Sequence, residues 1–383
     1  PFQSPAGICR TRHLPTPEKD TLRKSEFIGI TELETFKKPY IMKLFTLITG
    51  TVAVGLSMLL ANVQVNAAPQ PKTKLRPTKT VLLYPEGQNT DKGIEENGKT
   101  ITAGPGVSNG LTGPEKIESN GNMDNVGDSA RIDIYLPKRP NGQMIVVCPG
   151  GGYRILSTFN EGSYVADWFT KQGVSVCVVK YRLPNGHWTA PLTDVQNAFR
   201  YCRAHSEEWG IKQIGIIGFS AGGHLAASAS TLFTDDITRP DFSILVYPVI
   251  TMDLRLTHKG THDGLIGKES KWLDESLSVT EYKRKKAEYE SLMDRYSLEK
   301  QVTEKTPATM LLLCSDDKTV APENSFMYYD ALRKNGVDAQ LYVFPYGGHG
   351  CGFTTAEFGR DLIGPYRTVF FDAISTWLGE LRK

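Results

Sequence analysis

A serine set between glycines is the first feature of this sequence that could do chemistry. The pentapeptide G-F-S-A-G at 218–222 follows an apolar run at 213–217 and precedes an Ala-rich segment. A serine on a sharp turn from strand to helix projects its hydroxyl above the sheet, and the flanking glycines leave room for the strained backbone. The pattern therefore predicts Ser220 as a nucleophile, with the N-terminus of the following helix directed at the site.

The residues that would activate this serine are found later in the chain. A serine hydroxyl needs a base to take its proton and an acid to orient that base, and after this pentapeptide the acid precedes the histidine. Asp316 and Asp317 follow one apolar run, and His349 lies among glycines after the last such run. The apolar Val320 stands three residues after Asp317. We therefore predict Ser220, Asp317 and His349 as a catalytic triad, with Asp316 as a carboxylate that caps its loop.

Three consecutive glycines supply a third chemical feature. Residues 150–152 follow the apolar run at 142–148, and glycines let backbone N–H groups approach the oxygen of a substrate. A second donor is expected from the N–H of Ala221, the residue after the nucleophile. Glu161, in the sequence N-E-G, is a candidate buried carboxylate that braces this glycine-rich loop, and His224 is expected to pack or hydrogen-bond beneath the serine.

Strand-like and helical segments alternate from residue 130 to the C-terminus. Such alternation predicts a mostly parallel sheet with helices on its faces, the α/β class. The expected strands are 130–136, 142–148, 174–181, 213–217, 242–247, 309–314 and 339–344, and the expected helices are 163–172, 191–208, a helix from 221, 322–335 and 360–381.

Two regions interrupt or precede this alternation. Residues 252–304 are charged and largely helical, which predicts a small lid inserted between strands. Residues 69–80 read as a linker and 86–128 as loop, because Gly, Asn and Asp are frequent there and periodicity is weak. We therefore expect a linker and N-terminal loop or strand region at 68–129 and a catalytic domain at 130–383.

The N-terminal region carries the features of a secretory signal peptide. Lys43 precedes 18 uncharged residues at 44–61, and small residues precede a cleavage position after Ala67. We expect 1–41 to be an unstructured upstream extension, 42–67 a signal peptide, and the mature protein to be secreted to the periplasm. An uncleaved membrane anchor is the alternative, because 18 uncharged residues could just span a bilayer.

Composition and cysteine placement exclude several function classes. The formal net charge is +2 and no Lys/Arg-rich stripe stands out, so no nucleic-acid partner is expected. Cys148, Cys177 and Cys314 lie in apolar runs, where buried free thiols are expected. His258 and His262 are four residues apart, but Gly260 lies between them and favours a loop. No metal is therefore predicted. No cofactor is predicted either, because the chemistry expected of the triad needs none.

Several segments together resemble one family of α/β-hydrolase esterases, the bacterial enzymes related to acetylxylan and feruloyl esterases. These segments are CPGGGY, KYRLP, PLTDVQNAFRYCR, GFSAGGHLAAS, YPVITM, SDDKTVAPENS and YGGHGCGF. The resemblance covers residues from Thr80 to the C-terminus. It implies a secreted serine esterase acting on acetyl or other acyl esters of a plant polysaccharide such as xylan. It also implies Gly151, Gly152 and Ala221 around the oxyanion, although Pro149 stands where related lipases carry histidine.

Two other classes of function stay open at the level of sequence. The segments SDDKTV and GGHG also resemble prolyl-oligopeptidase-type peptidases, but too few residues precede 130 for the propeller that those enzymes carry. A carbohydrate-binding protein without catalysis is the second alternative, because a fold does not fix a function. Within the esterase class, feruloyl or general carboxylesterase activity is a further alternative. Every expected element of the triad and oxyanion hole is present, which favours the esterase.

Overall fold

The computed structural model describes residues 75–84, 94–96, 99–101, 107–108, 111–112, 116–124, 126, 130–353 and 361–383. All of them belong to one unit of the chain, Val63–Lys383. The predicted upstream extension at 1–41 and signal peptide at 42–67 lie outside the described residues. Among the helices that are described, none is both long enough and apolar enough to cross a membrane.

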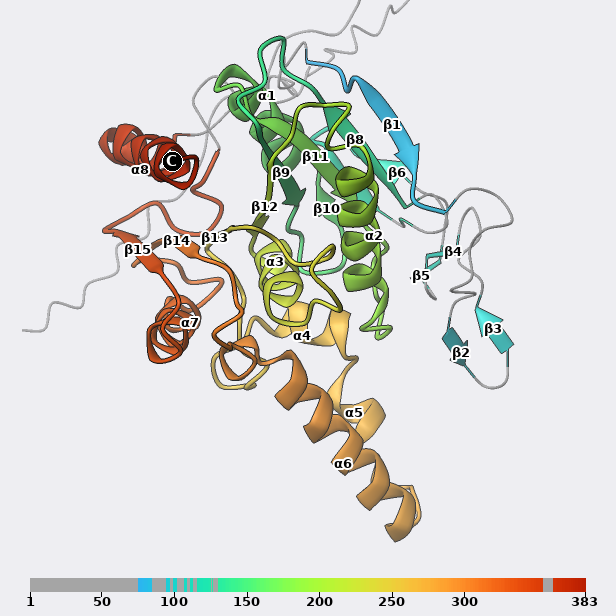
Figure 1. Cartoon of the computed structure of the whole chain (residues 1–383). Helices are drawn as coiled ribbons and strands as arrows, with labels where there is room; N and C mark the ends of the chain where they lie inside the picture. Colours follow the sequence, from blue (N-terminus) through green and yellow to red (C-terminus); the bar gives the residue numbers. More distant parts are fainter. Residues whose placement is uncertain are drawn as a thin grey trace, which may run out of the picture. The chain divides into compact units, whose positions relative to one another are not determined.

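An eight-stranded sheet forms the centre of this unit, in the order β1-β8-β11-β9-β12-β13-β14-β15 (Figure 1). The six strands from β11 to β15 run parallel, and β8 is antiparallel to both of its neighbours. The predicted mostly parallel sheet is therefore confirmed. The bounds are β1 Lys79–Leu82, β8 Arg131–Tyr135, β9 Gln143–Cys148, β11 Ser175–Lys180, β12 Gln213–Phe219, β13 Ser243–Val246, β14 Thr309–Cys314 and β15 Ala339–Phe344.

Helices cover both faces of the sheet and create two separate apolar cores. Helices α2, α3 and α7 contribute to one core and α1 and α8 to the other. Trp168 of α1 stacks on Phe371 of α8, with 4.9 Å between the ring centroids. Strands β9, β13 and β14 are buried at every position, as expected for strands covered on both faces. The bounds are α1 Tyr164–Lys171, α2 Ala190–Ala204, α3 Ala221–Thr231, α7 Glu323–Lys334 and α8 Arg367–Leu381.

The N-terminal region contains more strand than the sequence predicted. Strand β1 falls partly in the predicted linker at 69–80, and it extends the sheet to a position before the expected domain boundary at 130. The predicted loop at 86–128 contains short strands. These strands are only two or three residues long, too short to show the alternation that predicts a strand. They are β2 Ile94–Glu96, β3 Lys99–Ile101, β4 Val107–Ser108, β5 Leu111–Thr112, β6 Lys116–Ile117 and β7 Asn122–Asp124.

The last helix begins later than predicted. The expected helix at 360–381 is α8, which starts at Arg367 after a short 3₁₀ turn at Gly364–Tyr366. Pro365 lies in this turn, where it occupies one of the first helical positions and lacks an N–H to donate. The other predicted boundaries differ by a few residues, and the strands predicted at 309–314 and 339–344 are confirmed.

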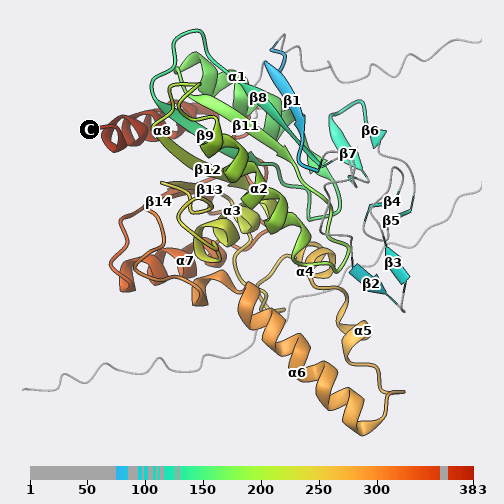
Figure 2. The same cartoon turned by 45° about the vertical axis from the view of Figure 1, so that its right-hand side comes forward.

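The charged segment at 252–304 forms a helical insertion between β13 and β14. It contains α4 Lys259–Leu265, α5 Glu269–Trp272, α6 Val279–Tyr296 and the 3₁₀ turn η2 Leu298–Lys300. Helix α6 points away from the sheet (Figure 2), and only three of its residues are buried. The insertion is observed, whereas its action as a lid stays a prediction.

The loop expected around Gly260 is wrong, because α4 is a helix there. Its N-cap is His258, whose ring accepts a hydrogen bond from the Thr261 N–H. Helix α4 packs so tightly on the loop after β9 that a Cβ at Gly264 would lie 3.0 Å from the carbonyl oxygen of Gly152. The capping bond and this close packing stabilise a short helix despite its glycines.

Candidate active site

The turn between β12 and α3 holds Ser220 in a strained conformation. Its backbone has φ 54° and ψ −120°, which few residues other than glycine adopt. A Cβ at Gly218 would overlap the carbonyl oxygen of Gly222, so a side chain at that position would push strand and helix apart. The serine hydroxyl is nearly buried, at 7% residue exposure, at the carboxyl edge of the sheet. This is the geometry that the G-x-S-x-G pattern predicts.

The three residues predicted as a triad lie in one hydrogen-bonded row. His349 Nε2 is 2.9 Å from Ser220 Oγ, and His349 Nδ1 is 2.7 Å from Asp317 Oδ2. A carboxylate only accepts hydrogen bonds, so the proton lies on Nδ1 and Nε2 is free to accept from the serine hydroxyl. The row can therefore take a proton from Ser220 without any rotation of the imidazole.

Backbone groups hold the aspartate ionised at the end of this row. Asp317 Oδ1 accepts from the N–H groups of Thr319 at 2.8 Å and Val320 at 3.0 Å. Burial alone would raise the pKa of Asp317, but its hydrogen bonds from His349 and these N–H groups bring the pKa below its ordinary value. A negative carboxylate next to the imidazole stabilises the imidazolium that forms when the serine loses its proton.

The neighbouring aspartate has a different partner. Asp316 Oδ1 accepts from the Gly348 N–H at 2.8 Å, and its Oδ2 accepts from the Gly347 N–H at 3.3 Å. It therefore braces the loop that carries His349 and does not contact the imidazole. The sequence favoured Asp317 as the triad acid and Asp316 as a loop-capping residue, and the positions of the two side chains agree with that choice.

The glycine-rich loop after β9 lies against the serine. A Cβ at Gly150 would be 2.6 Å from the Phe219 carbonyl oxygen and 3.0 Å from the Cβ of Ser220, so this position has room only for glycine. In the part of the chain that the structure describes, no hydrogen bond occupies the N–H groups of Gly151, Gly152 or Ala221. These are the three residues expected around the oxyanion, and their N–H groups are available to a substrate oxygen.

Glu161 fixes this loop from beneath, as the sequence suggested. It lies in the π-helical turn Phe159–Ser163, where its Oε2 accepts from the Gly150 N–H at 2.7 Å. Its Oε1 accepts from the Tyr247 hydroxyl at 3.0 Å. Burial raises the pKa of Glu161, and the hydrogen bonds from Gly150 and Tyr247 oppose that rise. The carboxylate ties the glycine-rich loop to the end of β13. Because residues of this loop are expected to bind the oxyanion, it is called the oxyanion loop below.

Glu161→Ala is expected to lower kcat for ester hydrolysis about 10- to 100-fold, because a misplaced oxyanion loop holds the transition state poorly. Glu161→Gln is the matched variant. Its amide oxygen can accept from Gly150 and its NH₂ can donate to the Tyr247 oxygen, so a much smaller fall is expected. Steady-state kinetics on p-nitrophenyl acetate and thermal melting measure both variants. An alanine variant with wild-type kcat would show that the loop needs no carboxylate.

Two tyrosines support the site without having been singled out in the sequence. The Tyr181 hydroxyl donates to the Pro149 carbonyl at 2.6 Å, and Tyr247 holds Glu161. Each follows the carboxyl end of a parallel strand, β11 or β13, where residues of α/β sheets face the ligand site. That position is the sequence feature that could have identified them.

His224 lies beneath the serine and is buried. Its Nε2–H donates to the Tyr296 carbonyl at 2.9 Å, and its Nδ1 accepts from the Tyr153 hydroxyl at 3.1 Å. Burial lowers the pKa of His224 to about 4, so the ring is neutral near pH 7. The expected supporting role of His224 is confirmed, and the ring links the oxyanion loop to the end of α6.

The histidines at 258 and 262 bond to different partners. His258 Nδ1 contacts the Thr261 hydroxyl at 2.9 Å. His262 contacts Asp263 through Nδ1 and the Tyr289 hydroxyl through Nε2, both at 2.9 Å. Across the described residues, no group of three or more His, Cys, Asp or Glu side chains is arranged to hold a metal ion.

Two arginine–aspartate pairs lie away from the predicted triad. Asp194 Oδ1 lies 2.8 Å from Nη2 of the Arg182 guanidinium, and both side chains are buried. Arg200 pairs with Asp235 at the surface. Asp194 and Arg200 therefore take part in ion pairs with other side chains of the fold. The five cysteines of the described residues are free and buried, including the three expected to be so, at 148, 177 and 314.

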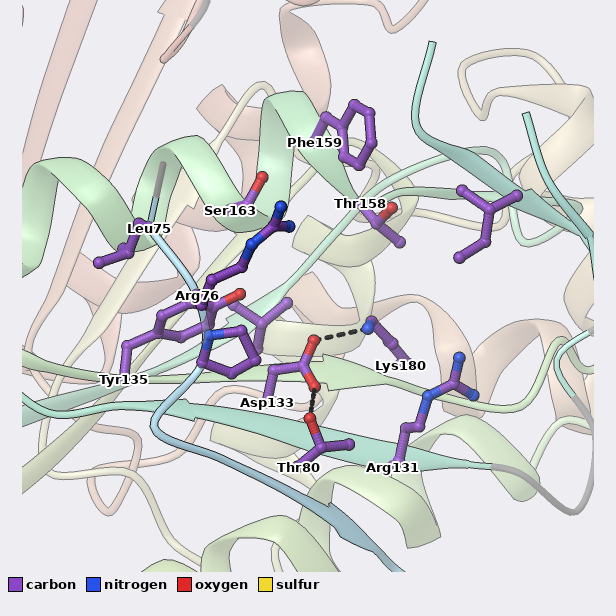
Figure 3. A pocket seen from close by; sticks show the side chains of 13 residues that line it. Leu75, Arg76, Thr80, Arg131, Asp133, Tyr135, Thr158, Phe159, Ser163 and Lys180 are labelled. Carbon is purple, nitrogen blue, oxygen red and sulfur yellow. Dashed lines mark hydrogen bonds and ion pairs between the residues drawn. The ribbon is translucent and has the colours of Figure 1, made fainter. Parts of the chain in front are cut away.

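A cavity of about 420 Å³ lies at the β1 edge of the sheet, and none of the predicted triad lines it (Figure 3). Asp133 lines the cavity, where it forms an ion pair with Lys180 at 2.5 Å and accepts a hydrogen bond from the Thr80 hydroxyl at 2.6 Å. The cavity is therefore separate from the candidate active site.

Comparison with known proteins shows the relationships of the chain. Residues 132–332, more than half of the chain, match the BD-FAE family. An acetylxylan esterase from Xylanibacter ruminicola is 40% identical over 230 residues, 59% of this chain and 44% of that protein. Endo-1,4-beta-xylanase B from Butyrivibrio fibrisolvens is 33% identical over 230 residues, 56% of this chain and 33% of that protein. The chain spans less than half the length of these curated relatives.

Solved structures show the same relationship. An acetyl ester-xyloside bifunctional hydrolase from Caldicellulosiruptor lactoaceticus has a TM-score of 0.57 and 27% identity, covering 81% of this chain and 98% of that chain. A sugar hydrolase from Lactococcus lactis has a TM-score of 0.51 and 26% identity, covering 67% of this chain and 95% of that chain. The predicted α/β-hydrolase fold and the predicted relationship to acetylxylan esterases are confirmed. The chain belongs to the BD-FAE family.

Proposed function

We propose that the chain is a serine esterase that removes acetyl groups from xylan or a similar acetylated polysaccharide. The observation that carries the proposal is the alignment of Ser220, His349 and Asp317, with contacts of 2.9 and 2.7 Å. The substrate is suggested by the relatives, which are named acetylxylan esterase, xylanase and acetyl ester-xyloside hydrolase. The signal peptide predicted at 42–67 agrees with a polymeric substrate outside the cytoplasm.

In the proposed mechanism, Ser220 attacks the ester carbonyl while His349 Nε2 takes the hydroxyl proton. The negative oxygen of the tetrahedral intermediate accepts hydrogen bonds from the N–H groups of Gly151, Gly152 and Ala221. His349 then returns the proton to the sugar oxygen as the C–O bond breaks, which leaves an acyl-enzyme on Ser220.

Water completes the cycle. His349 takes a proton from a water molecule that attacks the acyl-enzyme, and the serine leaves with that proton as acetate is released. The charge that appears on the imidazole in both halves is balanced by the Asp317 carboxylate. All proton transfers in this reaction use groups of the chain, the substrate or water.

Acetate release from acetylated xylan tests the proposal, with p-nitrophenyl acetate as a generic ester and an aminoacyl p-nitroanilide as a peptidase substrate. We expect release from both esters and none from the amide. Hydrolysis of the small ester alone would refute the polysaccharide assignment and favour feruloyl or other acyl esters. Cleavage of the amide alone would favour the peptidase alternative, and no cleavage of any substrate would contradict the enzyme.

A further inference from the structure

His258 presents an N–H donor that nothing in the proposed mechanism uses. Its Nδ1 accepts from the Thr261 N–H at 3.2 Å and lies 2.9 Å from the Thr261 hydroxyl. A ring nitrogen that accepts a backbone N–H carries no proton, so a neutral His258 has its proton on Nε2. Among the described residues, none forms a hydrogen bond with this Nε2–H.

The ring of His258 lies beside the oxyanion loop. A Cβ at Gly152 would be 3.6 Å from the His258 Cε1, and helix α4 packs on the same loop through Gly264. Burial lowers the pKa of His258, the charge of His349 lowers it further, and the charge of Asp317 opposes both. The ring is therefore neutral, partly exposed and within electrostatic range of the triad.

The chemistry of an acetyl ester limits what can accept this hydrogen bond. The methyl group has no acceptor, and the carbonyl oxygen is held by the N–H groups of Gly151, Gly152 and Ala221 in the proposed mechanism. The bridging ester oxygen receives its proton from His349 in the same mechanism. The remaining acceptors are the hydroxyl, ring and glycosidic oxygens of the sugar. A polar group held by a capping contact at the edge of the site is suited to fix their orientation.

We propose that His258 is a substrate-binding residue whose Nε2–H donates a hydrogen bond to the sugar portion of the acetylated substrate. This inference rests on the proposed function, because it places the scissile ester between Ser220 and the oxyanion loop. It assigns a specificity role to the helical insertion through the N-cap of α4. The rate of hydrolysis of a sugar ester should therefore depend on His258 more strongly than that of an ester without a sugar.

The variants H258N and H258Q separate this contact from the capping of α4. Asparagine keeps a side-chain oxygen that can accept from the Thr261 N–H, and asparagine is a favourable N-cap, but its side chain does not reach the position of Nε2. Glutamine reaches further and carries an NH₂ donor near that position. Thermal melting of both variants reports whether α4 and the fold are retained.

The experiment compares kcat/KM on an acetylated xylo-oligosaccharide with kcat/KM on p-nitrophenyl acetate. We expect H258N to lower the ratio of the two values about 3- to 10-fold, the range for one neutral hydrogen bond, chiefly through a higher KM for the sugar ester. H258Q should restore part of the ratio. An unchanged ratio in folded H258N, or an equal fall on both esters, would overturn the proposal.

Ser220→Ala in the same assays distinguishes a failure of the proposed esterase function from a failure of the proposed role of His258. If Ser220→Ala retains hydrolysis of either ester, the proposed function fails for that ester and the role of His258 falls with it. If Ser220→Ala is inactive on both esters and H258N leaves the ratio unchanged, only the role of His258 is refuted.

Discussion

Ser220→Ala is expected to lower kcat for both acetylated xylan and p-nitrophenyl acetate about a millionfold, the size of effect seen when a serine nucleophile is removed. Alanine cannot form the acyl-enzyme, and His349 then has no hydroxyl to deprotonate. Background hydrolysis aided by the oxyanion donors is all that should remain. The variant keeps a Cβ on the backbone at φ 54°, so it adds no new strain to the turn.

Ser230→Ala is the matched control for this variant. Ser230 is also a buried serine of α3, and its hydroxyl donates to the Ala226 carbonyl within the helix. Its loss should leave kcat within about twofold, because no part of it contacts the triad, and cost at most about 1 kcal/mol of stability. Steady-state rates, melting temperatures and labelling with a serine-directed phosphonate measure both variants. Equal rates for Ser220→Ala and wild type would favour a protein without this catalysis.

The proximity of Ser220, Asp317 and His349 could be predicted from the sequence because each of them follows a strand. Ser220 follows β12, Asp317 follows β14 and His349 follows β15. These strands lie in parallel order in one sheet, with only β13 between β12 and β14. Carboxyl ends of parallel strands meet at one edge, so residues distant in sequence come together there. Recognising the three strands was therefore enough to predict that the three side chains lie close together.

The details of the supporting contacts could not be predicted in the same way. The sequence suggested Glu161 as a brace for the glycine-rich loop, but its bond from the Gly150 N–H depends on a π-helical turn, which no periodic pattern in the sequence indicates. The approach of His258 to Gly152 depends on how α4 packs, and α4 was predicted as loop because of Gly260. Short elements are fixed by their tertiary contacts, so sequence periodicity gives little information about them.

Tertiary contacts also explain why strand β1 was not predicted from the sequence. Val81 pairs with Ile132 in an antiparallel register, and β1 contains only four residues. A strand of that length is recognised by the partner strand beside it and not by its own alternation. Strand β13 is also four residues long but is buried throughout, so it forms an apolar run that the sequence shows, whereas β1 is mostly exposed and forms none.

Asp317→Asn is expected to lower kcat about ten thousandfold while the protein stays folded. The asparagine NH₂ would donate toward His349 Nδ1, which then accepts and carries no proton. The proton moves to Nε2, where it faces Ser220 Oγ, and the imidazole can no longer act as the base. The 2.7 Å contact between Nδ1 and Oδ2 makes this reversal of the tautomer direct.

Asp316→Asn tests the same chemical change one residue away. Its amide oxygen can still accept from the Gly348 N–H, so the loop that carries His349 keeps a brace and kcat should fall less than about tenfold. Single-turnover acetate release separates the acylation step from product release in both variants. A large loss in Asp316→Asn together with a small loss in Asp317→Asn would reverse the assignment of the triad acid. The expected opposite order would show that orientation of the imidazole, and not negative charge near the loop, is what the catalytic site requires.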